Sequence, residues 1–189
     1  MVLAHHITFG MYGFWLPNDP RGSGSTRVGS WDLRRYGTAT KTDSRRSVAG
    51  NPHDFNARRA AKNLLKYPPV RITGRQAVEV AKGFALASEE ANVTIHACAI
   101  MPDHVHLVIG RTSRDIEKVR THMKSRATKS LKQSGLWHED GRPVWGRRGW
   151  VVFLDSEAAV RRAIKYVENN PIKEGLKRQR WSFVEEYRG

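Results

Sequence analysis

Two histidines one residue apart, a tyrosine and an asparagine are the residues of this sequence whose types and spacing could do chemistry. His104 and His106 lie in the segment 101–109, which is apolar enough to form a buried strand. Because side chains alternate along a strand, both imidazoles point to one face. Further along the chain, Tyr166 is followed one helical turn later by Asn170, whose amide could complete a metal site. Two imidazoles on a metal ion, together with a phenol, form a set suited to phosphoryl transfer.

Each of these residues also has an ordinary structural explanation. A His-x-His pair taken alone is more often part of a core or a surface than a metal site. Tyr166 lies at the border of the apolar stripe of its predicted helix, and Asn170 precedes Pro171, where a helix often ends. A residue before proline is pushed out of helical geometry, so Asn169 is an alternative ligand. Three further histidines on predicted strands could support the pair or be interior residues: His5, His6 and His96.

Hydrophobic periodicity and capping signals predict the elements that must position these residues. Strands are predicted at 3–9, 93–101, 104–109 and 150–154. Helices are predicted from Thr73, from Ser113 or Asp115, and from Asp155 or Ser156 to the Asn170–Pro171 boundary. This order predicts an α+β fold, a ferredoxin-like (RRM-like) βαββαβ antiparallel sheet. Its helices would cover one face and leave the other open to a ligand, with a C-terminal helix carrying the tyrosine.

The organisation along the chain predicts one domain over residues 1–189. Gly, Ser, Pro and Arg dominate residues 18–70, where hydrophobic periodicity is weak, so a long, basic, irregular insertion is expected after the first strand. Residues 176–189 are expected to form a C-terminal tail.

The charge predicts a polyanionic partner. The net charge is +15, and two segments contribute most of it: residues 18–71 hold 12 basic and 4 acidic side chains, and residues 111–150 hold 11 and 4. Nucleic acid is the leading candidate, although a basic protein can simply be soluble. The single Cys98, the absence of a signal peptide and the absence of a long apolar run predict a cytoplasmic protein with no membrane contact.

The segments 101–109 and 164–176, read in order, resemble the single-tyrosine HUH transposases, specifically the REP-associated tyrosine transposases. The first reads Met-Pro-Asp-His-Val-His-Leu-Val-Ile and the second Ile-Lys-Tyr-Val-Glu-Asn-Asn-Pro-Ile-Lys-Glu-Gly-Leu. The opening segment 5–17 and Val144-Trp145 are also similar to that group. The resemblance covers most of the chain except residues 18–70.

The resemblance implies a role for each matching residue. His104, His106 and Asn170 would bind a divalent metal ion, Mg²⁺ or Mn²⁺, although imidazole ligands alone would also permit Zn²⁺. Tyr166 would attack single-stranded DNA beside a hairpin and form a 5′-phosphotyrosine link. That link conserves the energy of the phosphodiester, so no nucleotide cofactor is expected, and the sequence has no nucleotide-binding loop. The active unit would be a monomer or a homodimer.

Recognition of DNA is expected to come from basic residues, because no helix-turn-helix or zinc finger is evident. The candidates are Arg147, Arg148, Arg34, Arg35, Arg45 and Arg46, with Arg58 and Arg59 as further members. Trp137, Trp145 and Trp150 interleave with arginines and could stack on bases, or could belong to the core. Two other functions remain open: a catalytically inactive RRM-like nucleic-acid-binding module, and another HUH nickase such as a replication initiator.

Overall fold

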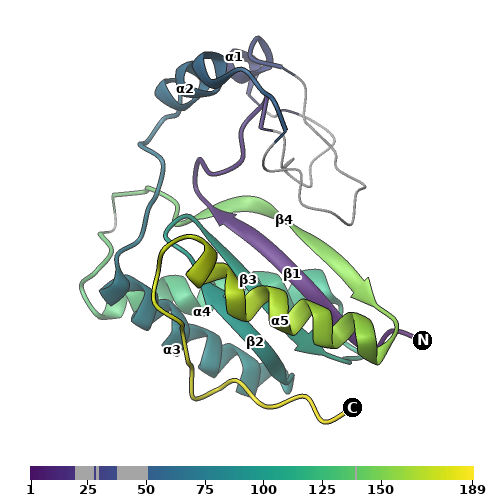
Figure 1. Ribbon diagram of the computed structural model, residues 1–189. Coiled ribbons are helices and arrows are strands. Elements are labelled where there is room, and N and C mark those ends of the chain that lie inside the picture. Colours follow the sequence, from purple (N-terminus) through teal and green to yellow (C-terminus); the bar gives the residue numbers. More distant parts are fainter. Residues whose placement is uncertain (20–27, 29, 38–50, 139) are drawn as a thin grey trace. The chain divides into compact units, whose positions relative to one another are not determined.

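The structure, a computed structural model, describes residues 1–19, 28, 30–37, 51–138 and 140–189. Its sheet has the strand order β2-β3-β1-β4, as Figure 1 shows, and the predicted α+β fold with a four-stranded antiparallel sheet is confirmed. The strands are β1 (Ala4–Met11), β2 (Ile95–Ile100), β3 (His104–Gly110) and β4 (Trp145–Leu154). The helices are α1 (Trp31–Arg34), α2 (Phe55–Asn63), α3 (Gly74–Ala91), α4 (Ile116–Gln133) and α5 (Glu157–Lys173).

The predicted capping signals begin the long helices. Thr73 and Gln76 form the expected capping box at α3. The Thr73 hydroxyl accepts from the backbone N–H of Gln76, and the side-chain oxygen of Gln76 accepts from the backbone N–H of Thr73. Asp115 caps α4 and Ser156 caps α5 through side-chain oxygens that accept backbone N–H groups. These bonds satisfy donors that a helix leaves unpaired at its start, so the helix boundaries are encoded locally.

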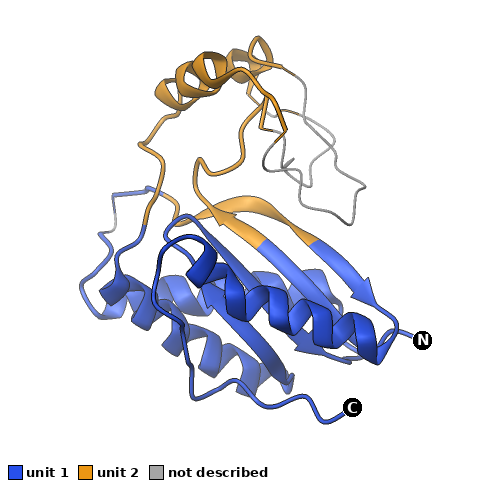
Figure 2. Ribbon diagram, viewed as in Figure 1, with its two compact units in different colours: residues 1–8, 72–142, 151–189 blue, residues 9–71, 143–150 orange. Residues whose placement is uncertain are grey.

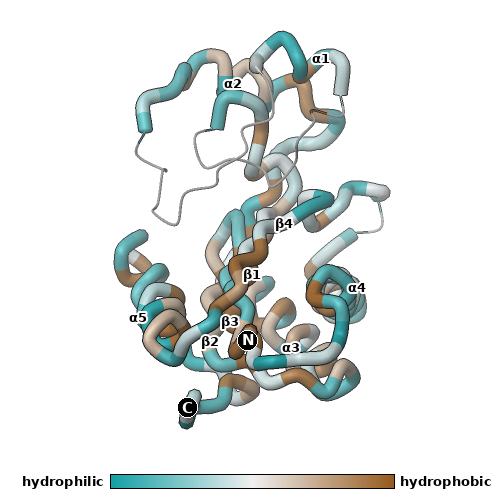
Figure 3. The backbone as a smooth tube through the Cα atoms, turned by 90° about the vertical axis from the view of Figure 1, so that its right-hand side faces the viewer, coloured by the Kyte–Doolittle hydropathy of each residue, from teal (hydrophilic) through white to brown (hydrophobic). Residues whose placement is uncertain are grey.

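Helices lie on both faces of the sheet, and Figure 3 shows α5 on one side with α3 and α4 on the other. A buried cluster joins α5 to the sheet through Val160, Ala163 and Val167, which meet Ala99 and Val108. The prediction that one face of the sheet is open is therefore wrong in part, because the apolar stripe of α5 is buried against that face. In β3 the residues at even positions point toward α5, and those at odd positions point toward α3 and α4.

Gly83 lets α3 and α4 approach closely. A Cβ at this position would lie 2.4 Å from the Cα of Ala127 on α4, which is closer than real side chains come. The two helices thus meet backbone to backbone at a pair of small residues, and this contact holds the layer behind β3.

Three local predictions need correction. The insertion is not irregular throughout, since α2 forms within it: Asp54 accepts from the Ala57 amide at 2.9 Å and starts a helix whose apolar stripe is too short to predict. Strand β4 begins at Trp145, five residues before the predicted start, because pairing with β1 extends it through glycines and arginines. Pro171 lies inside α5 and does not end it.

The C-terminal segment 176–189 contacts the outer strand β2. The Gln179 side chain donates to the Ile100 carbonyl and accepts from the Ile100 amide, both at 2.8 Å. Val184 pairs with Ile95 in a parallel bridge, and the Glu185 amide donates to the Ile95 carbonyl at 2.9 Å. Because an outer strand has unpaired backbone groups, these bonds cover an edge that could otherwise pair with another chain.

The chain divides into two compact units, coloured separately in Figure 2. Unit 1 comprises residues 1–8, 72–142 and 151–189, and unit 2 comprises residues 9–71 and 143–150. The single domain expected from the sequence stays a prediction. No helix in the described ranges combines the length and the apolar character needed to cross a membrane.

Candidate active site

Strand β3 places His104 and His106 side by side on the face that α5 covers. Their ring centroids are 4.8 Å apart, and the side chains are almost completely buried. In the hairpin with β2, His106 lies opposite Ala99, a small residue that leaves room above the strand. The strand alternation predicted from the sequence therefore brings the two imidazoles together, with Val105 buried behind them.

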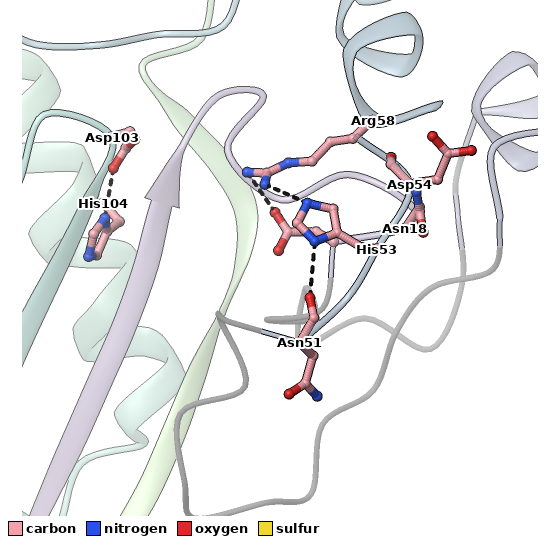
Figure 4. A network of polar contacts seen from close by, with 8 residues as sticks. Asn18, Asn51, His53, Asp54, Arg58, Asp103 and His104 are labelled. Carbon is pink, nitrogen blue, oxygen red and sulfur yellow. Dashed lines mark hydrogen bonds and ion pairs between the residues drawn. The ribbon is translucent and has the colours of Figure 1, made fainter. Parts of the chain in front are cut away.

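Each imidazole of the pair is oriented by an oxygen at its Nδ1 atom. The Asp103 carboxylate lies 2.8 Å from His104 Nδ1, as Figure 4 shows, and the Thr8 hydroxyl lies 2.9 Å from His106 Nδ1. A protonated Nδ1 that donates to such an oxygen leaves the lone pair of the ring at Nε2. Histidines that bind metal ions are usually held in this way, because the outer hydrogen bond fixes the tautomer and the direction of the ligand atom.

A third histidine, His6 on β1, contacts the pair. Its Nε2 atom lies 3.2 Å from His106 Nδ1, and its ring centroid lies 5.4 Å from that of His106 and 5.7 Å from that of Tyr166. His6 is therefore the residue, among the three left open by the sequence, that supports the pair. His5 packs instead against Phe153, and His96 Nδ1 donates to the backbone carbonyl of Glu185.

Burial keeps two of these rings, those of His6 and His106, neutral. Burial lowers the pKa of His6 to about 4. Burial, followed by the nearby His104 and His6 rings, holds the pKa of His106 well below the usual value of 6.5. Neutral imidazole is the form that binds a metal ion, so at neutral pH His106 needs no deprotonation before binding.

Tyr166 of α5 lies against the histidines of the same chain. Its ring centroid is 5.5 Å from that of His106, and its side chain is 38% exposed, so the phenol is reachable from solvent. Burial and then the negative Glu174 raise the pKa of Tyr166 above its usual value of 10. The phenol is thus protonated at rest. The Lys173 ammonium, 5.4 Å from the ring centroid, is the cation that faces it.

Asn170 lies one turn after Tyr166 in regular helix and is buried. Because α5 continues to Lys173, the expected fraying before Pro171 does not occur, and Asn169 is not needed as a substitute. The Asn170 Nδ2 atom is buried without a hydrogen-bond partner among the described residues. Rotating the amide by half a turn brings its oxygen to that position, where a cation would satisfy it.

The donor set fits a divalent ion. No group of three His, Cys, Asp or Glu side chains suitable for a metal ion occurs within the described part of the chain. The amide of Asn170, if it joined the two imidazoles, would make a mixed nitrogen and oxygen set that leaves coordination positions for substrate oxygens.

The arginines predicted to bind DNA fall in unit 2. Arg147 and Arg148 are exposed on β4, and Arg35 is exposed after α1. The Arg34 guanidinium lies 4.0 Å from the Trp31 ring centroid. Arg45 and Arg46 lie outside the described residues. Arg58 is instead committed within the unit, since it forms an ion pair at 3.1 Å with the fully buried Asp19.

Of the three tryptophans considered for stacking, Trp137 is buried and donates to the Arg142 carbonyl at 3.2 Å. Trp145 is partly buried and meets Phe9 edge to face, with centroids 5.3 Å apart. Both therefore have packing roles, and Trp150 is also partly buried.

Sequence reasoning did not identify Thr8, Asp103 and Lys173 as members of the site. Lys173 follows Tyr166 at a helical spacing of seven, which is a usable signal. Asp103 is typical of a turn residue, so its sequence gives no sign of a role in the site. Thr8 can be assigned to the site only when β1 is known to lie beside β3, and no local sequence pattern predicts that strand order.

Comparisons with known proteins identify the family and the fold of the chain. A family model described as "Transposase IS200 like" matches residues 64–170, more than half of the chain. A solved REP-associated tyrosine transposase bound to a REP hairpin is similar in fold, with a TM-score of 0.50 and 14% identity over 93% of this chain and 70% of that one. A candidate transposase of Deinococcus radiodurans R1 has 14% identity over 89% of this chain and 91% of that one, with a TM-score of 0.40. No curated protein matches the chain.

Proposed function

This chain belongs to the IS200-like transposase family, and we propose that it is a metal-dependent endonuclease and strand transferase for single-stranded DNA. The family makes it a DNA-processing enzyme, and the finer assignment rests on the site. One observation carries it: two buried imidazoles, each with Nδ1 bound to an oxygen, lie with their ring centroids 4.8 Å apart, and the ring of one of them, His106, lies 5.5 Å from the Tyr166 ring of the same chain.

Tyr166 is the nucleophile in this proposal. Its Oη attacks a phosphorus of single-stranded DNA, the Oη–P bond forms and the P–O3′ bond breaks. The phenolic proton leaves to water at the partly exposed hydroxyl, and the departing 3′-oxygen takes up a proton from water. The product is a 5′-phosphotyrosine and a free 3′-hydroxyl. Attack by another 3′-hydroxyl reverses or redirects the reaction, so strand transfer needs no other energy source.

His104, His106 and Asn170 would hold Mg²⁺ or Mn²⁺. The ion, when bound, would polarise the scissile phosphate and offset the charge that develops on its oxygens. The chain's own contribution is orientation: Asp103 and Thr8 direct the two imidazoles, and α5 carries the nucleophile and the amide ligand one turn apart.

Lys173 would assist the phenol. Because burial and Glu174 disfavour the phenolate, Tyr166 needs a compensating positive charge as its proton leaves. The Lys173 ammonium is close enough to supply part of that charge. DNA with a hairpin is the proposed substrate, by analogy with the solved relative, whose ligand is a REP hairpin.

A covalent-adduct assay tests the proposal. Full-length protein incubated with Mn²⁺ and a labelled strand carrying a hairpin and a single-stranded flank should yield a protein–DNA adduct that resists denaturation. Tyr166→Phe should abolish it, whereas Tyr187→Phe, which removes a tyrosine of the C-terminal segment, should leave it unchanged. An adduct that persists in Tyr166→Phe would refute the assignment of the nucleophile.

The histidines are tested by separating cleavage from binding. His104→Ala and His106→Ala should abolish the adduct but leave most of the DNA affinity, because their roles are metal binding and orientation. His96→Ala, on the neighbouring strand, is the matched control and should cleave normally. A parallel loss of binding and cleavage would favour the inactive RRM-like module. That alternative also expects exposed aromatic side chains on the central strands, whereas β1 and β3 carry histidines beneath α5.

A further inference from the structure

Unit 2 exposes two large aromatic side chains that its own packing does not use. Trp31 at the start of α1 is 79% exposed and Phe55 at the start of α2 is 71% exposed. Single exposed apolar residues are common, but large aromatic rings usually bury most of their area. Two such rings on neighbouring helices therefore indicate a surface that binds something.

The two helices that carry these rings are held together within unit 2. The Asn18 side chain donates to the Asp54 carbonyl at the start of α2 at 2.7 Å, and the backbone of Gly37, just after α1, packs against Asn18. Figures 1 and 3 both show α1 and α2 side by side. The ion pair between Arg58 and the buried Asp19 ties α2 to the same loop.

Each ring already contacts one polar group. The Arg34 guanidinium lies 4.0 Å from the Trp31 ring centroid, and its Nε donates to the Val28 carbonyl at 3.2 Å. The His53 and Phe55 ring centroids are 4.1 Å apart, and His53 is in turn hydrogen-bonded to Arg58. Because both rings remain mostly exposed, each can accept a second flat partner, such as an unpaired base.

The basic charge of residues 18–71 indicates which kind of partner this surface binds. Residues 18–71 contain 12 basic and 4 acidic side chains, and two of the basic ones are exposed on the helices themselves: Arg35 at the end of α1 and Arg59 within α2. This excess attracts a polyanion and disfavours a second copy of the same basic surface. Aromatic rings beside cations bind single-stranded nucleic acid, with bases on the rings and phosphates on the arginines.

We propose that Trp31 and Phe55 form an accessory site for single-stranded DNA on unit 2, where each ring stacks on an unpaired base while neighbouring arginines contact the backbone. The inference deepens the proposed function, on which the identity of the strand as DNA rests. It assigns to the insertion a role in gripping the unpaired flank of the substrate.

Binding measurements on the full chain test this site without requiring catalysis. Tyr166→Phe serves as the background, so that no strand is cleaved, and fluorescence anisotropy follows a labelled oligothymidylate and, separately, a blunt hairpin without unpaired flanks. Trp31→Ala and Phe55→Ala should each weaken oligothymidylate binding about tenfold and leave blunt-hairpin binding nearly unchanged. Trp31→Phe, which keeps a ring, should retain most of the affinity.

The matched control is Leu86→Ala, which removes a half-exposed apolar side chain from α3 in unit 1 and should change neither affinity. Unchanged oligothymidylate binding in Trp31→Ala and Phe55→Ala would overturn the site, as would equal losses on both ligands. Sedimentation showing that Trp31→Ala dissociates a dimer would assign the surface to self-association and also overturn it. If the adduct assay fails while the oligothymidylate effect holds, the accessory site stands and the proposed nuclease does not.

Discussion

The hydroxyl of Thr8 offers the sharpest test of the proposed metal site, because it is a small group whose removal changes one hydrogen bond. Thr8→Val keeps the shape of the side chain and removes the oxygen 2.9 Å from His106 Nδ1. With that oxygen gone, the buried imidazole can still turn to His6, whose Nε2 lies 3.2 Å from the same atom. A neutral His6 can accept this hydrogen bond through Nε2. The contact is longer than the one to Thr8, so it would direct the His106 ring less well.

The magnitude follows from these contacts. A hydrogen bond of this kind contributes about 1 kcal/mol, which corresponds to about a fivefold change in affinity. Measured losses after removing a hydrogen-bond partner of a metal ligand are about 10- to 100-fold. Because His6 can compensate in part, we expect Thr8→Val to weaken Mn²⁺ binding about tenfold. Thr8→Ser, which restores the hydroxyl, should bind nearly as well as the wild type.

Calorimetric titration with Mn²⁺, without DNA, measures this effect independently of cleavage. DNA affinity in the absence of metal should be equal in all three proteins. The reasoning is refuted if Thr8→Val binds Mn²⁺ as tightly as the wild type. It is also refuted if Thr8→Ser loses as much as Thr8→Val, because packing and not the hydroxyl would then be the cause.

Three further predictions concern stability and rate. Gly83→Ala should lower the free energy of unfolding by about 1–3 kcal/mol in denaturant titrations, because its Cβ would meet the Ala127 backbone; Gly74→Ala in the same helix, with open space at its Cβ, should not. Acidification from pH 6.5 toward 4 should destabilise the protein by up to about 3 kcal/mol through His6, whose lowered pKa makes the unfolded chain take up the proton first. Melting temperatures should drop less in His6→Phe over that range, and equal drops would contradict this origin. Lys173→Met should slow adduct formation about fivefold, with Lys173→Arg restoring it, because the cation stabilises the reacting phenol.

Local chemistry made much of the fold predictable. The hairpin of β2 and β3, the capping box at Thr73 and the cap at Ser156 follow from residues close together in sequence, and the structure confirms all three. The helix α2 escaped prediction because its nine residues have a single buried member, Ala61, and so little apolar periodicity. The end of α5 was also mispredicted, since the packing of the helix against the sheet outweighs the local preference of Pro171.

The sequence by itself determined which groups can do the chemistry: two imidazoles on one face of a strand, and a phenol and an amide one turn apart on a helix. These relations follow from fixed backbone periods, so no tertiary information was needed. The tertiary structure decided what surrounds them. The order β2-β3-β1-β4 brings Thr8 and His6 to His106, and the packing of α5 on that face brings Tyr166 to the same ring. Such contacts join residues that are 60 to 100 positions apart, and they depend on burial of whole faces, which no local pattern encodes.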